Sequence, residues 1–525
     1  MLNHPEEIMS INRRVLFRTA GLAAGVAGAG AFLNACGTSI PASGPVRHTV
    51  PSVARSGGVL RAVFTGGGAA ESLDPFGSGS PVDFVRGDVV FDSLFTLSGG
   101  EVVPALATGI EVGPGATSFV LTLREGVKWH DGSPFTADDV AYSFRFMSSP
   151  ERAYPSQLSA YFDFDKLQIR DPFTLVVPAR RPVGDPALFL AAFPGKMVKN
   201  GATFTGATAI GTGAYQVTVF EAGRESRLKR FDGHWSGKAP ADELVLLSLS
   251  DPQAKVNAVV TGQADYAGDI PFITGKAGVA GNDFEVRTAG EENRTAYGWV
   301  LNTTRKPFDD PRARKAVRLA ISRRALVDTV LLGYGVPGND LLCAGAKYFT
   351  PRDVPARDLD QARKLVKESG ADATEIVIRT AEWEIGYNAS TQLLVEQLKE
   401  AGLKVRADIV SPPEFFEPNA VGAANAVAFS SGAVPLAVIY GRLAAYPPLA
   451  LKDDGFTAAF GRAIGSADEA ERAKAWKDAQ EIMYDRGNTV VWGQADVLSL
   501  ARKAVAGITV RDQAKYPYLG KAGLA

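Results

Sequence analysis

Hydrophobic and polar positions alternate in several short stretches of this chain, and these stretches predict β-strands. At residues 118–123 the alternation has the period of two that is typical of a half-buried strand. Residues 167–177 and 215–230 each contain two such runs around a turn, at Asp171-Pro172 and at Glu221-Ala222-Gly223. Both segments are therefore predicted to be hairpins.

Apolar positions three and four residues apart predict helices in other segments. One helix is expected to begin at Thr136, because Thr136 and Asp139 have the spacing of a capping box. A second helix follows Asp310-Pro311, and a third, amphipathic helix covers residues 466–486. The side of the second helix that is expected to be solvated surface carries Arg312, Arg314, Lys315 and Arg318.

Helix and strand alternate more regularly in the second half of the chain. A helix that ends at Gly370 precedes a strand at residues 375–379, and a helix that stops at Gly402 precedes a strand at residues 403–410. This spacing predicts a parallel, right-handed strand–helix–strand unit. Mixed sheets with helices on their faces indicate an α/β protein, and 525 residues are too many for one core, so more than one domain is expected.

The N-terminal segment has the order of residue types expected of a secretory signal. A positive cluster that contains Arg13-Arg14 precedes Thr19–Ala35, a stretch rich in Ala and Gly without any charged residue. This stretch lacks the length of about 20 residues and the content of Leu, Ile and Val that a membrane-spanning helix needs. The alternatives are an uncleaved signal anchor and a buried N-terminal helix.

The residues Leu33-Asn34-Ala35-Cys36 resemble a bacterial lipobox. The resemblance implies that residues 1–35 are removed as a signal peptide and that lipid is attached to Cys36. Residues 36–56, rich in Gly, Ser, Pro and Thr, then form a flexible tether. The protein is expected on the outer face of the cytoplasmic membrane, exported by the twin-arginine route that Arg13-Arg14 suggests or by the Sec route.

Composition narrows the classes of function. Hydrophobic residues make up 46% of the chain, which is typical of a globular protein. The net charge of −1 gives no electrostatic reason to expect binding to nucleic acid. Because the lipobox takes one of the two cysteines, Cys343 is left alone and no internal disulfide is predicted.

Motifs that carry catalysis are mostly missing. The sequence contains no HExxH, no GxSxG and no phosphate-binding GxxxxGK[ST] pattern. Only His130 and His234 lie beyond the predicted tether, and they are far apart, so neither a metal nor another cofactor is expected. Ser226 and Lys229 match an SxxK pattern but belong to an alternating, strand-like stretch. The sequence therefore indicates a binding protein and not an enzyme.

The most specific motif occupies residues 123–140 and reads Leu-Arg-Glu-Gly-Val-Lys-Trp-His-Asp-Gly-Ser-Pro-Phe-Thr-Ala-Asp-Asp-Val. It strongly resembles the extracellular solute-binding proteins of the peptide/nickel family, the dipeptide- and oligopeptide-binding receptors of ABC importers. Further segments that match the family occur along the chain in the family's order. They are Ser72–Pro75, Gly211–Tyr215, Phe231–Trp235, Asn302–Ala320, Gln392–Val405 and Ala475–Met483. The resemblance covers residues 57–510.

This resemblance implies a two-lobed periplasmic-binding-protein fold of type II, in its three-domain peptide-binding variety. The ligand cleft would lie between the lobes, and a hinge would close them. The expected boundaries are residues 57–99, 209–296 and 487–525 for lobe I, 100–208 for an inserted domain, and 297–486 for lobe II. In the family, the segment Trp129-His130-Asp131-Gly132 is a structural signature of the inserted domain, so His130 is predicted to be part of the scaffold.

Two segments are expected to bind the ligand. Receptors of this family hold a peptide backbone by strand-like hydrogen bonds. In lobe I the matching residues, small enough to allow close approach, are Gly77, Ser78, Gly79, Ser80 and Pro81. In lobe II the matching residues are Phe429, Ser430, Ser431 and Gly432.

The second segment departs from the family pattern Gly-Trp-x-x-Asp-Tyr-x-Asp-Pro. The tryptophan is absent, and so is the aspartate that pairs with the free amino group of a peptide, with Val434 close to its position. An ammonium group that leaves water without a counter-charge is strongly destabilised. Either Asp408, Glu414 or Glu417 supplies the charge, or the ligand has no free cationic terminus, as in a modified peptide, a sugar-like compound or a chelate.

The sequence as a whole predicts a substrate-binding lipoprotein of an ABC importer. The protein would capture a peptide or similar small polar solute outside the membrane and deliver it to permease and ATPase subunits, acting as a monomer without a cofactor. The alternative is a non-transport role on the same scaffold, as a ligand sensor or an accessory lipoprotein. A hydrolase is disfavoured.

Overall fold

The described part of the chain contains two large mixed sheets, a four-stranded sheet and two small two-stranded ones. In this computed structural model the described residues are 53–77, 79–152, 155–192, 195–204, 208–279, 283–415, 417, 420–511 and 513–525. The predicted signal peptide, most of the predicted tether, Cys36 and Ser78 lie outside these ranges. Among the described residues, no helix combines the length and the apolar character that crossing a membrane requires.

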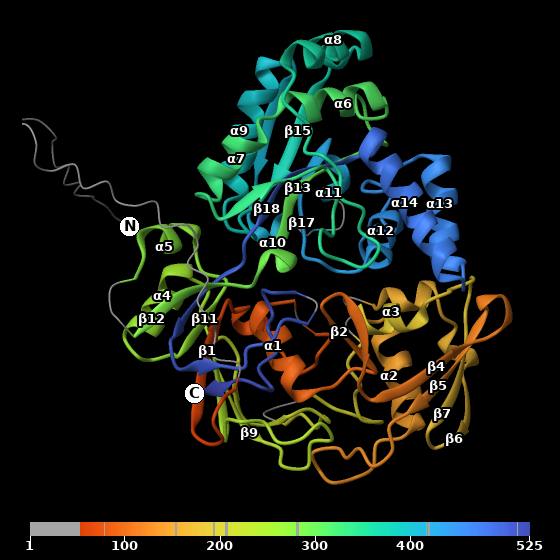
Figure 1. Ribbon diagram of the computed structural model, residues 1–525, viewed down its shortest axis with the longest axis vertical. Helices are drawn as coiled ribbons and strands as arrows, with labels where there is room; N and C mark the ends of the chain where they lie inside the picture. The colour runs from red at the N-terminus through yellow and green to blue at the C-terminus, as the bar shows by residue number, and fades with distance from the viewer. Residues whose placement is uncertain are drawn as a thin grey trace, which may run out of the picture. The chain divides into compact units, whose positions relative to one another are not determined.

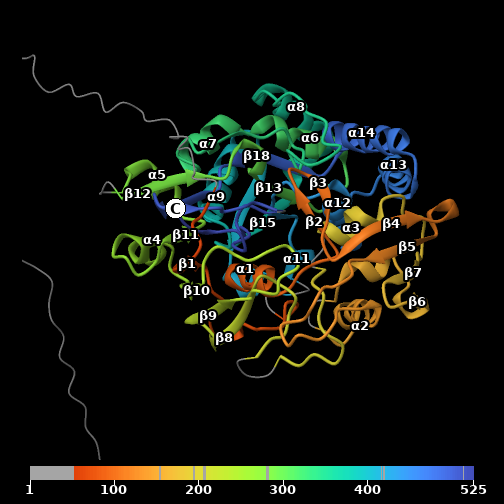
Figure 2. The ribbon, with the colours of Figure 1, turned by 60° about the horizontal axis from the view of Figure 1, so that its bottom comes forward.

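The seven-stranded sheet is organised around β1 (Val59–Phe64), which pairs in parallel with β10 and β11. Successive residues of a strand face opposite sides of its sheet. Leu60 and Phe64 accordingly join one hydrophobic cluster, whereas Val63 joins another. Helix α1 (Pro81–Val90) packs on the first side, against β1, β8 and β10 (Figure 2). The strand order is β12 (Phe284–Thr288), β19 (Leu498–Arg502), β11 (Tyr266–Gly268), β1, β10 (Glu243–Ser248), β9 (Glu225–Arg230) and β8 (Tyr215–Glu221).

The six-stranded sheet contains the predicted parallel unit. β15 pairs in parallel with both β16 and β17, and α9 (Tyr387–Glu400) connects β15 to β16, which confirms the predicted strand–helix–strand unit. The strand order is β14 (Gly335–Pro337), β18 (Thr489–Ala495), β13 (Thr295–Leu301), β17 (Ala426–Ser431), β15 (Glu375–Thr380) and β16 (Lys404–Ile409). β18 lies in the range expected for lobe I, yet it pairs with β13 in this sheet.

Four helices share one hydrophobic cluster with this sheet, and Figure 1 shows them around β13, β15 and β18. They are α6 (Pro311–Ala320), α7 (Arg323–Val330), α8 (Leu359–Ser369) and α9. Helix α8 ends at Gly370, in the left-handed conformation that glycine adopts readily, as the sequence predicted.

The antiparallel four-stranded sheet has the order β4 (Ala107–Val112), β5 (Ser118–Leu123), β7 (Thr174–Pro178) and β6 (Gln168–Asp171). These bounds confirm the predicted strand and the first predicted hairpin, and β8 and β9 confirm the second. Helix α2 (Ala137–Ser148) begins with the predicted capping box, in which the backbone N–H of Thr136 donates to Asp139 over 2.9 Å. Local sequence spacing is sufficient to set these elements.

Three helices share one hydrophobic cluster with the four-stranded sheet and its helices α2 and α3 (Pro186–Ala192), and the first of them contacts α3. They are α12 (Leu436–Ala445), α13 (Asp454–Gly465) and α14 (Glu469–Arg486). The approach is close enough to require glycine: a Cβ on Gly184 would lie 1.7 Å from the Ser466 carbonyl oxygen. The Gly184 N–H instead donates to the Ile464 carbonyl over 2.8 Å.

The prediction of a solvated basic face on α6 was wrong for Arg314 and Arg318, which are both buried. Arg318 donates to the backbone carbonyls of Tyr484 and Met483, and Arg314 donates to those of Arg486 and Gly487. The last carbonyls of a helix lack partners within the helix. The two guanidinium groups supply those partners at the end of α14, where cations are also favoured by the helix dipole.

Candidate functional site

Three motifs from distant parts of the sequence meet around His130. The His130 Nδ1 accepts a hydrogen bond from the Gly211 N–H at 3.1 Å, and its Nε2 lies 3.0 Å from the Gly213 carbonyl oxygen. Burial lowers the pKa of His130, which keeps the ring neutral, with a hydrogen on Nε2 that can be donated to Gly213. His130 therefore has the scaffold role that the family resemblance implied.

Asp92 connects the same junction to the motif that contains His234 and Trp235. Its buried carboxylate lies 3.3 Å from His234 Nε2 and accepts hydrogen bonds from Trp235 Nε1 at 2.9 Å and Thr212 Oγ1 at 3.1 Å. Burial by itself raises the pKa of Asp92, but the hydrogen bonds and the charge of His234 outweigh it and lower the pKa to about 2. Both histidines of the described chain therefore support structure.

The predicted ligand-binding segment of lobe I lies at the start of α1. Gly77 closes a turn by donating its N–H to the Asp74 carbonyl over 3.0 Å. Gly79 is exposed, and a Cβ built there would meet nothing within 4 Å. Ser80 is the N-cap residue and Pro81 the first residue of α1. The predicted residues of lobe I thus form a backbone segment that leads into the first turn of α1 and has open space around Gly79.

The predicted ligand-binding segment of lobe II lies at the carboxyl end of β17. Phe429 is half-buried against the cluster that surrounds the four-stranded sheet. Ser430 Oγ donates to Glu384 over 2.9 Å, and Ser431 Oγ donates to the Gly432 carbonyl over 3.0 Å. The side chains of Ser430 and Ser431 are thus already engaged within the protein.

Glu384 is a charged residue of this region that the sequence did not single out. It forms a buried ion pair with Lys515, from the C-terminal segment, and accepts hydrogen bonds from Ser430 and from the Tyr297 hydroxyl. Lys515 also lies 4.0 Å from Asp269. Glu384 and Lys515 are far apart in the sequence, and no motif in either segment predicts that they form an ion pair.

The three carboxylates offered as substitutes for the missing aspartate are either paired within the protein or exposed. Asp408 accepts hydrogen bonds from the Arg379 guanidinium, with Nε at 2.9 Å and Nη2 at 2.8 Å. Glu414, within α10 (Pro412–Phe415), and Glu417, which follows this helix, are both exposed. Val434, close to the position of the family's aspartate, is buried. The buried carboxylate in this region is Glu384, and its partner is a lysine of the chain itself.

Two nucleophile candidates are buried in the framework. Ser226 lies in β9, as the sequence predicted, and its Oγ accepts a hydrogen bond from Arg86 Nε at 2.8 Å. Cys343 is fully buried, with its Sγ 3.9 Å from Ser431 Oγ, and burial raises the pKa of its thiol to about 12. At neutral pH the thiol stays protonated, and only the thiolate is strongly nucleophilic.

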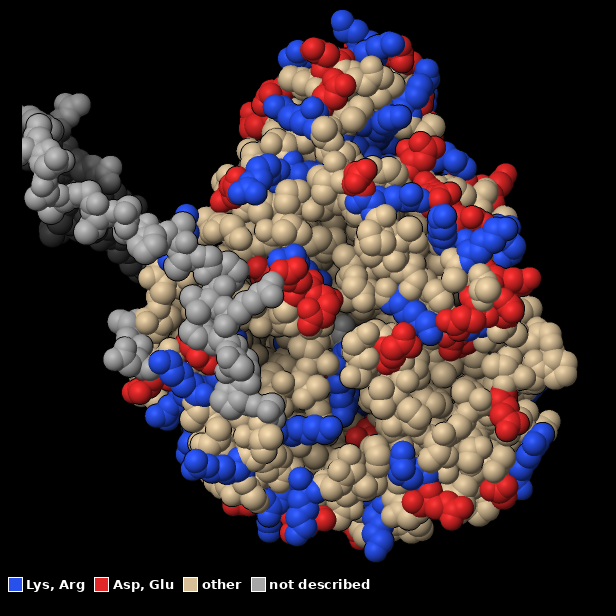
Figure 3. All heavy atoms as spheres, in the orientation of Figure 1, with Lys and Arg blue, Asp and Glu red and all other residues tan. Residues whose placement is uncertain are grey.

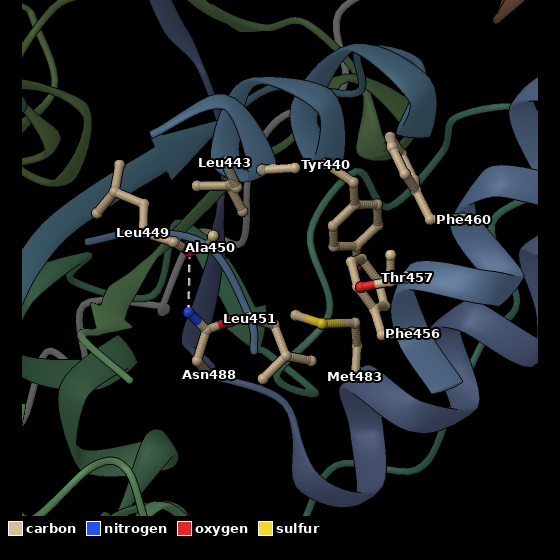
Figure 4. A pocket seen from close by; sticks show the side chains of 11 residues that line it. Tyr440, Leu443, Leu449, Ala450, Leu451, Phe456, Thr457, Phe460, Met483 and Asn488 are labelled. Carbon is tan, nitrogen blue, oxygen red and sulfur yellow. Dashed lines mark hydrogen bonds between the residues drawn. The ribbon is translucent and has the colours of Figure 1, made fainter. Parts of the chain in front are cut away.

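A cavity of about 220 Å³ lies between α12, α13 and α14 (Figure 4). Its lining is mainly apolar and includes Tyr440, Leu443, Phe456, Phe460 and Met483. Asn488 places its amide at the edge, where Nδ2 donates to the Leu449 carbonyl over 2.9 Å. The cavity belongs to the packing of these helices and contains none of the predicted ligand-binding residues.

Charge and metal-ligating groups add little to the site. Lys and Arg are interspersed with Asp and Glu over the face drawn in Figure 3, which matches the net charge of −1. In the ranges that the structure describes, no group of three or more His, Cys, Asp or Glu side chains is arranged to hold a metal ion.

Comparison with known protein sequences gives one family. The model for bacterial extracellular solute-binding proteins, family 5 middle, matches residues 101–437. The glutathione-binding protein of Salmonella paratyphi A is 26% identical over 349 residues, which cover 64% of this chain and 66% of that protein. The glutathione-binding protein of Escherichia coli O157:H7 is 25% identical, with the same coverage. The match spans slightly less than two thirds of the length of these relatives.

Solved structures share the fold over most of the chain. The PBP AgaA from A. tumefaciens R10, in complex with agropinic acid, has a TM-score of 0.76 at 20% identity, covering 89% of this chain and 99% of that one. The dipeptide-binding protein of Pseudoalteromonas sp. SM9913, in complex with Met-Leu, has a TM-score of 0.76 at 16% identity, covering 89% and 100%. The predicted α/β fold of the peptide-binding periplasmic type is therefore confirmed.

Proposed function

This chain belongs to the bacterial extracellular solute-binding proteins of family 5, and from that premise we propose that it captures a peptide or similar small polar solute for an ABC importer. The observation that carries the proposal is the family match over residues 101–437, which includes the four-stranded sheet and the end of β17. The relatives are substrate-binding proteins and not enzymes, so no catalytic activity is proposed.

The proposed ligand position lies between two lobes, one around each large sheet. Lobe I would comprise residues 57–99, 209–296 and 487–525, and lobe II residues 297–486, with the inserted domain at residues 100–208. The strand β18 would then pass from one lobe into the sheet of the other, because it pairs with β13. Strands that cross between lobes are suited to act as the hinge about which the lobes close.

The free edge of β17 supports binding of an extended ligand. β17 pairs with β13 along its whole length, but with β15 only at Ala426 and Val427. From Ala428 to Ser431, the edge turned away from β13 has no strand partner among the described residues. An unpaired strand edge can take up an extended peptide by backbone hydrogen bonds. The proposed contacts are Phe429, Ser430, Ser431 and Gly432 from this strand end, and Gly77 to Pro81 from the other lobe.

Mass spectrometry of the solute that co-purifies with the native protein tests this function. The full chain is extracted from its membrane in detergent, and the solutes released on unfolding are compared with those from a mock extract. A peptide or small polar solute present in stoichiometric amount is the expected result. The absence of any specific solute, together with no thermal stabilisation by peptide libraries, would contradict solute capture.

The gene neighbourhood separates import from the alternative roles. Neighbouring genes for two permeases and one or two ATPases would support delivery of the solute to an importer. A gene far from any such cluster, encoding a protein that no ligand stabilises, would favour a sensor or an accessory lipoprotein on the same scaffold.

The proposed lipid anchor is tested at Cys36. Cys36→Ala is expected to release most of the protein into the medium in soluble form, because lipid on this cysteine is the proposed attachment to the membrane. Immunoblotting of membrane and medium fractions measures the change. Cys343→Ala is the matched control, since Cys343 is buried in the folded part. Retention of the Cys36→Ala protein on the membrane would refute the anchor.

A further inference from the structure

The ion pair between Lys515 and Glu384 connects the two proposed lobes. Lys515 comes from the C-terminal segment of lobe I, and Glu384 follows β15 in lobe II. Their side chains are 10% and 8% exposed, so the contact excludes most water. The buried pair of Arg323 with Asp340, by contrast, lies within lobe II. A motion that separates the lobes would therefore break the pair of Lys515 with Glu384.

Glu384 is fixed to lobe II by two hydrogen bonds. Ser430 Oγ donates to its Oε1 over 2.9 Å, and the Tyr297 hydroxyl donates to its Oε2 over 3.4 Å. Tyr297 belongs to β13 and Ser430 to β17, which are neighbours in the six-stranded sheet. The carboxylate would thus stay with this sheet when the lobes separate.

The chain on either side of Lys515 packs on lobe I. The ring of Tyr516 stacks on Phe84 of α1 at a centroid distance of 4.8 Å. Tyr518 is buried in the hydrophobic cluster that contains residues of α1 and β1. The last strand, β21 (Gly523–Leu524), contacts β1. Lys515 therefore extends its side chain from lobe I to lobe II.

A second carboxylate for Lys515 lies within lobe I. Asp269, directly after β11, places its Oδ2 4.0 Å from the Lys515 Nζ, and its side chain is 28% exposed. The backbone of Asp269 is held by the buried Lys255, whose Nζ donates to the carbonyls of Gly268 and Asp269 over 2.9 and 2.6 Å. Lys515 therefore has one carboxylate of each lobe within reach.

We propose that Lys515 changes its partner as the lobes move: it pairs with Glu384 in the closed form and with Asp269 in the open form. This inference rests on the proposed solute capture between two lobes. The flexible four-carbon chain of a lysine lets its ammonium group turn from one carboxylate to the other while its backbone stays in place. Closure then requires no ammonium group from the solute, because the chain itself supplies one to Glu384.

The two carboxylates have opposite effects on the balance between closed and open protein. Without Lys515, Glu384 would be a buried charge with no counter-charge in the closed form, whereas water would hydrate it in the open form. Asp269 favours the open form, because it gives Lys515 a counter-charge that does not depend on closure. Both carboxylates share one lysine in the closed form, where like charges repel.

Single-molecule fluorescence energy transfer tests the proposal on the full chain in detergent, dialysed free of solute. Dyes are attached at Ala222→Cys, in the turn between β8 and β9 of lobe I, and at Lys367→Cys, on α8 of lobe II, since both positions are exposed. Cys343 is buried and stays unlabelled, and the proposed lipid blocks Cys36. Wild type is expected to show two transfer efficiencies, one for closed and one for open protein.

The two sides of the exchange are distinguished by the sign of the change. Lys515→Met is expected to lower the closed-to-open ratio roughly 10-fold, because it leaves Glu384 without a counter-charge in the closed form. Asp269→Asn is expected to raise the ratio, because it removes the partner of Lys515 in the open form. Asparagine tolerates the φ of 49° at this position, so this variant adds little backbone strain.

Two further variants complete the design. Glu384→Gln keeps the shape of the side chain and tests the pair from lobe II, also where Lys515→Met does not fold. It should lower the ratio less than Lys515→Met does, because Asp269 still lies near the ammonium group. Lys238→Met is the matched control, since Lys238 is exposed and pairs with Asp232 at 3.0 Å within lobe I. It should leave the ratio unchanged.

Three results are decisive against the proposal or the function beneath it. Equal ratios in wild type, Lys515→Met and Glu384→Gln, or shifts of the same sign for Lys515→Met and Asp269→Asn, overturn the exchange of partners and leave solute capture intact. A single transfer efficiency in wild type and every variant means that the lobes do not move, which also overturns the exchange. Failure of solute capture is recognised separately, by the absence of a co-purified solute, whatever the transfer efficiencies.

Discussion

Asp340→Ala is expected to lower the free energy of unfolding by about 3–5 kcal/mol, because it would leave buried guanidinium groups without a counter-charge. Both Asp340 oxygens accept hydrogen bonds from Arg323 Nη2, at 2.7 and 2.8 Å, and Arg318 Nε lies 3.9 Å away. The side chains of Asp340 and Arg323 are 1% and 2% exposed, so water cannot replace the lost carboxylate. Urea unfolding followed by tryptophan fluorescence measures the change.

Two further variants isolate the cause of this loss. The backbone of Asp340 has a φ of 67°, a left-handed conformation that is less favourable in free energy for alanine than for asparagine. Asp340→Asn therefore removes the charge without adding this backbone strain. Asp328→Ala removes an exposed carboxylate that pairs with Arg324 at 2.8 Å on the same helix, and is expected to cost only about 0.3–0.5 kcal/mol. Equal losses for the Asp340 and Asp328 variants would disprove the special role of the buried pair.

Sequence patterns predicted those parts of the fold that depend on neighbouring residues. The capping box at Thr136, the two hairpins and the stop at Gly370 each involve contacts within a few positions, and all are present. The basic residues of α6 were misjudged for the opposite reason. Arg314 and Arg318 have the spacing of a solvated face, but their partners are carbonyls of α14, more than 160 positions away in the chain. Spacing on one helix does not reveal such a partner.

The candidate site, like the fold, could be predicted from the sequence only in part. Ser430 and Ser431 could be selected because they match the position of a family motif, and the structure places them at the end of β17. Glu384 and Lys515 could not be selected, because each is a common charged residue whose environment is assembled by the fold: the two lie in distant parts of the chain and form a buried ion pair.

Asp92→Asn is expected to lower the free energy of unfolding by about 2 kcal/mol at neutral pH, with a loss that shrinks in acid. The pKa of Asp92 is lowered from 3.8 to about 2 in the folded protein, and each pKa unit corresponds to about 1.4 kcal/mol. A carboxyl group with a depressed folded pKa stabilises the protein above its unfolded pKa. This stabilisation is lost as the pH falls through the folded pKa, here between pH 4 and pH 2.

The difference between wild type and Asp92→Asn, measured by urea unfolding at a series of pH values, should therefore narrow as the pH falls from 5 toward 2. Asp131→Asn provides the comparison, because the pKa of Asp131 is also lowered to about 2, through Lys199 and Ser133. Its side chain is 35% exposed, so solvent screens the interaction and the expected loss is at most about 1 kcal/mol. The buried Asp92 holds His234, Trp235 and Thr212 together at once. A pH-independent difference would mean that packing of these groups, and not the charge of Asp92, stabilises the junction.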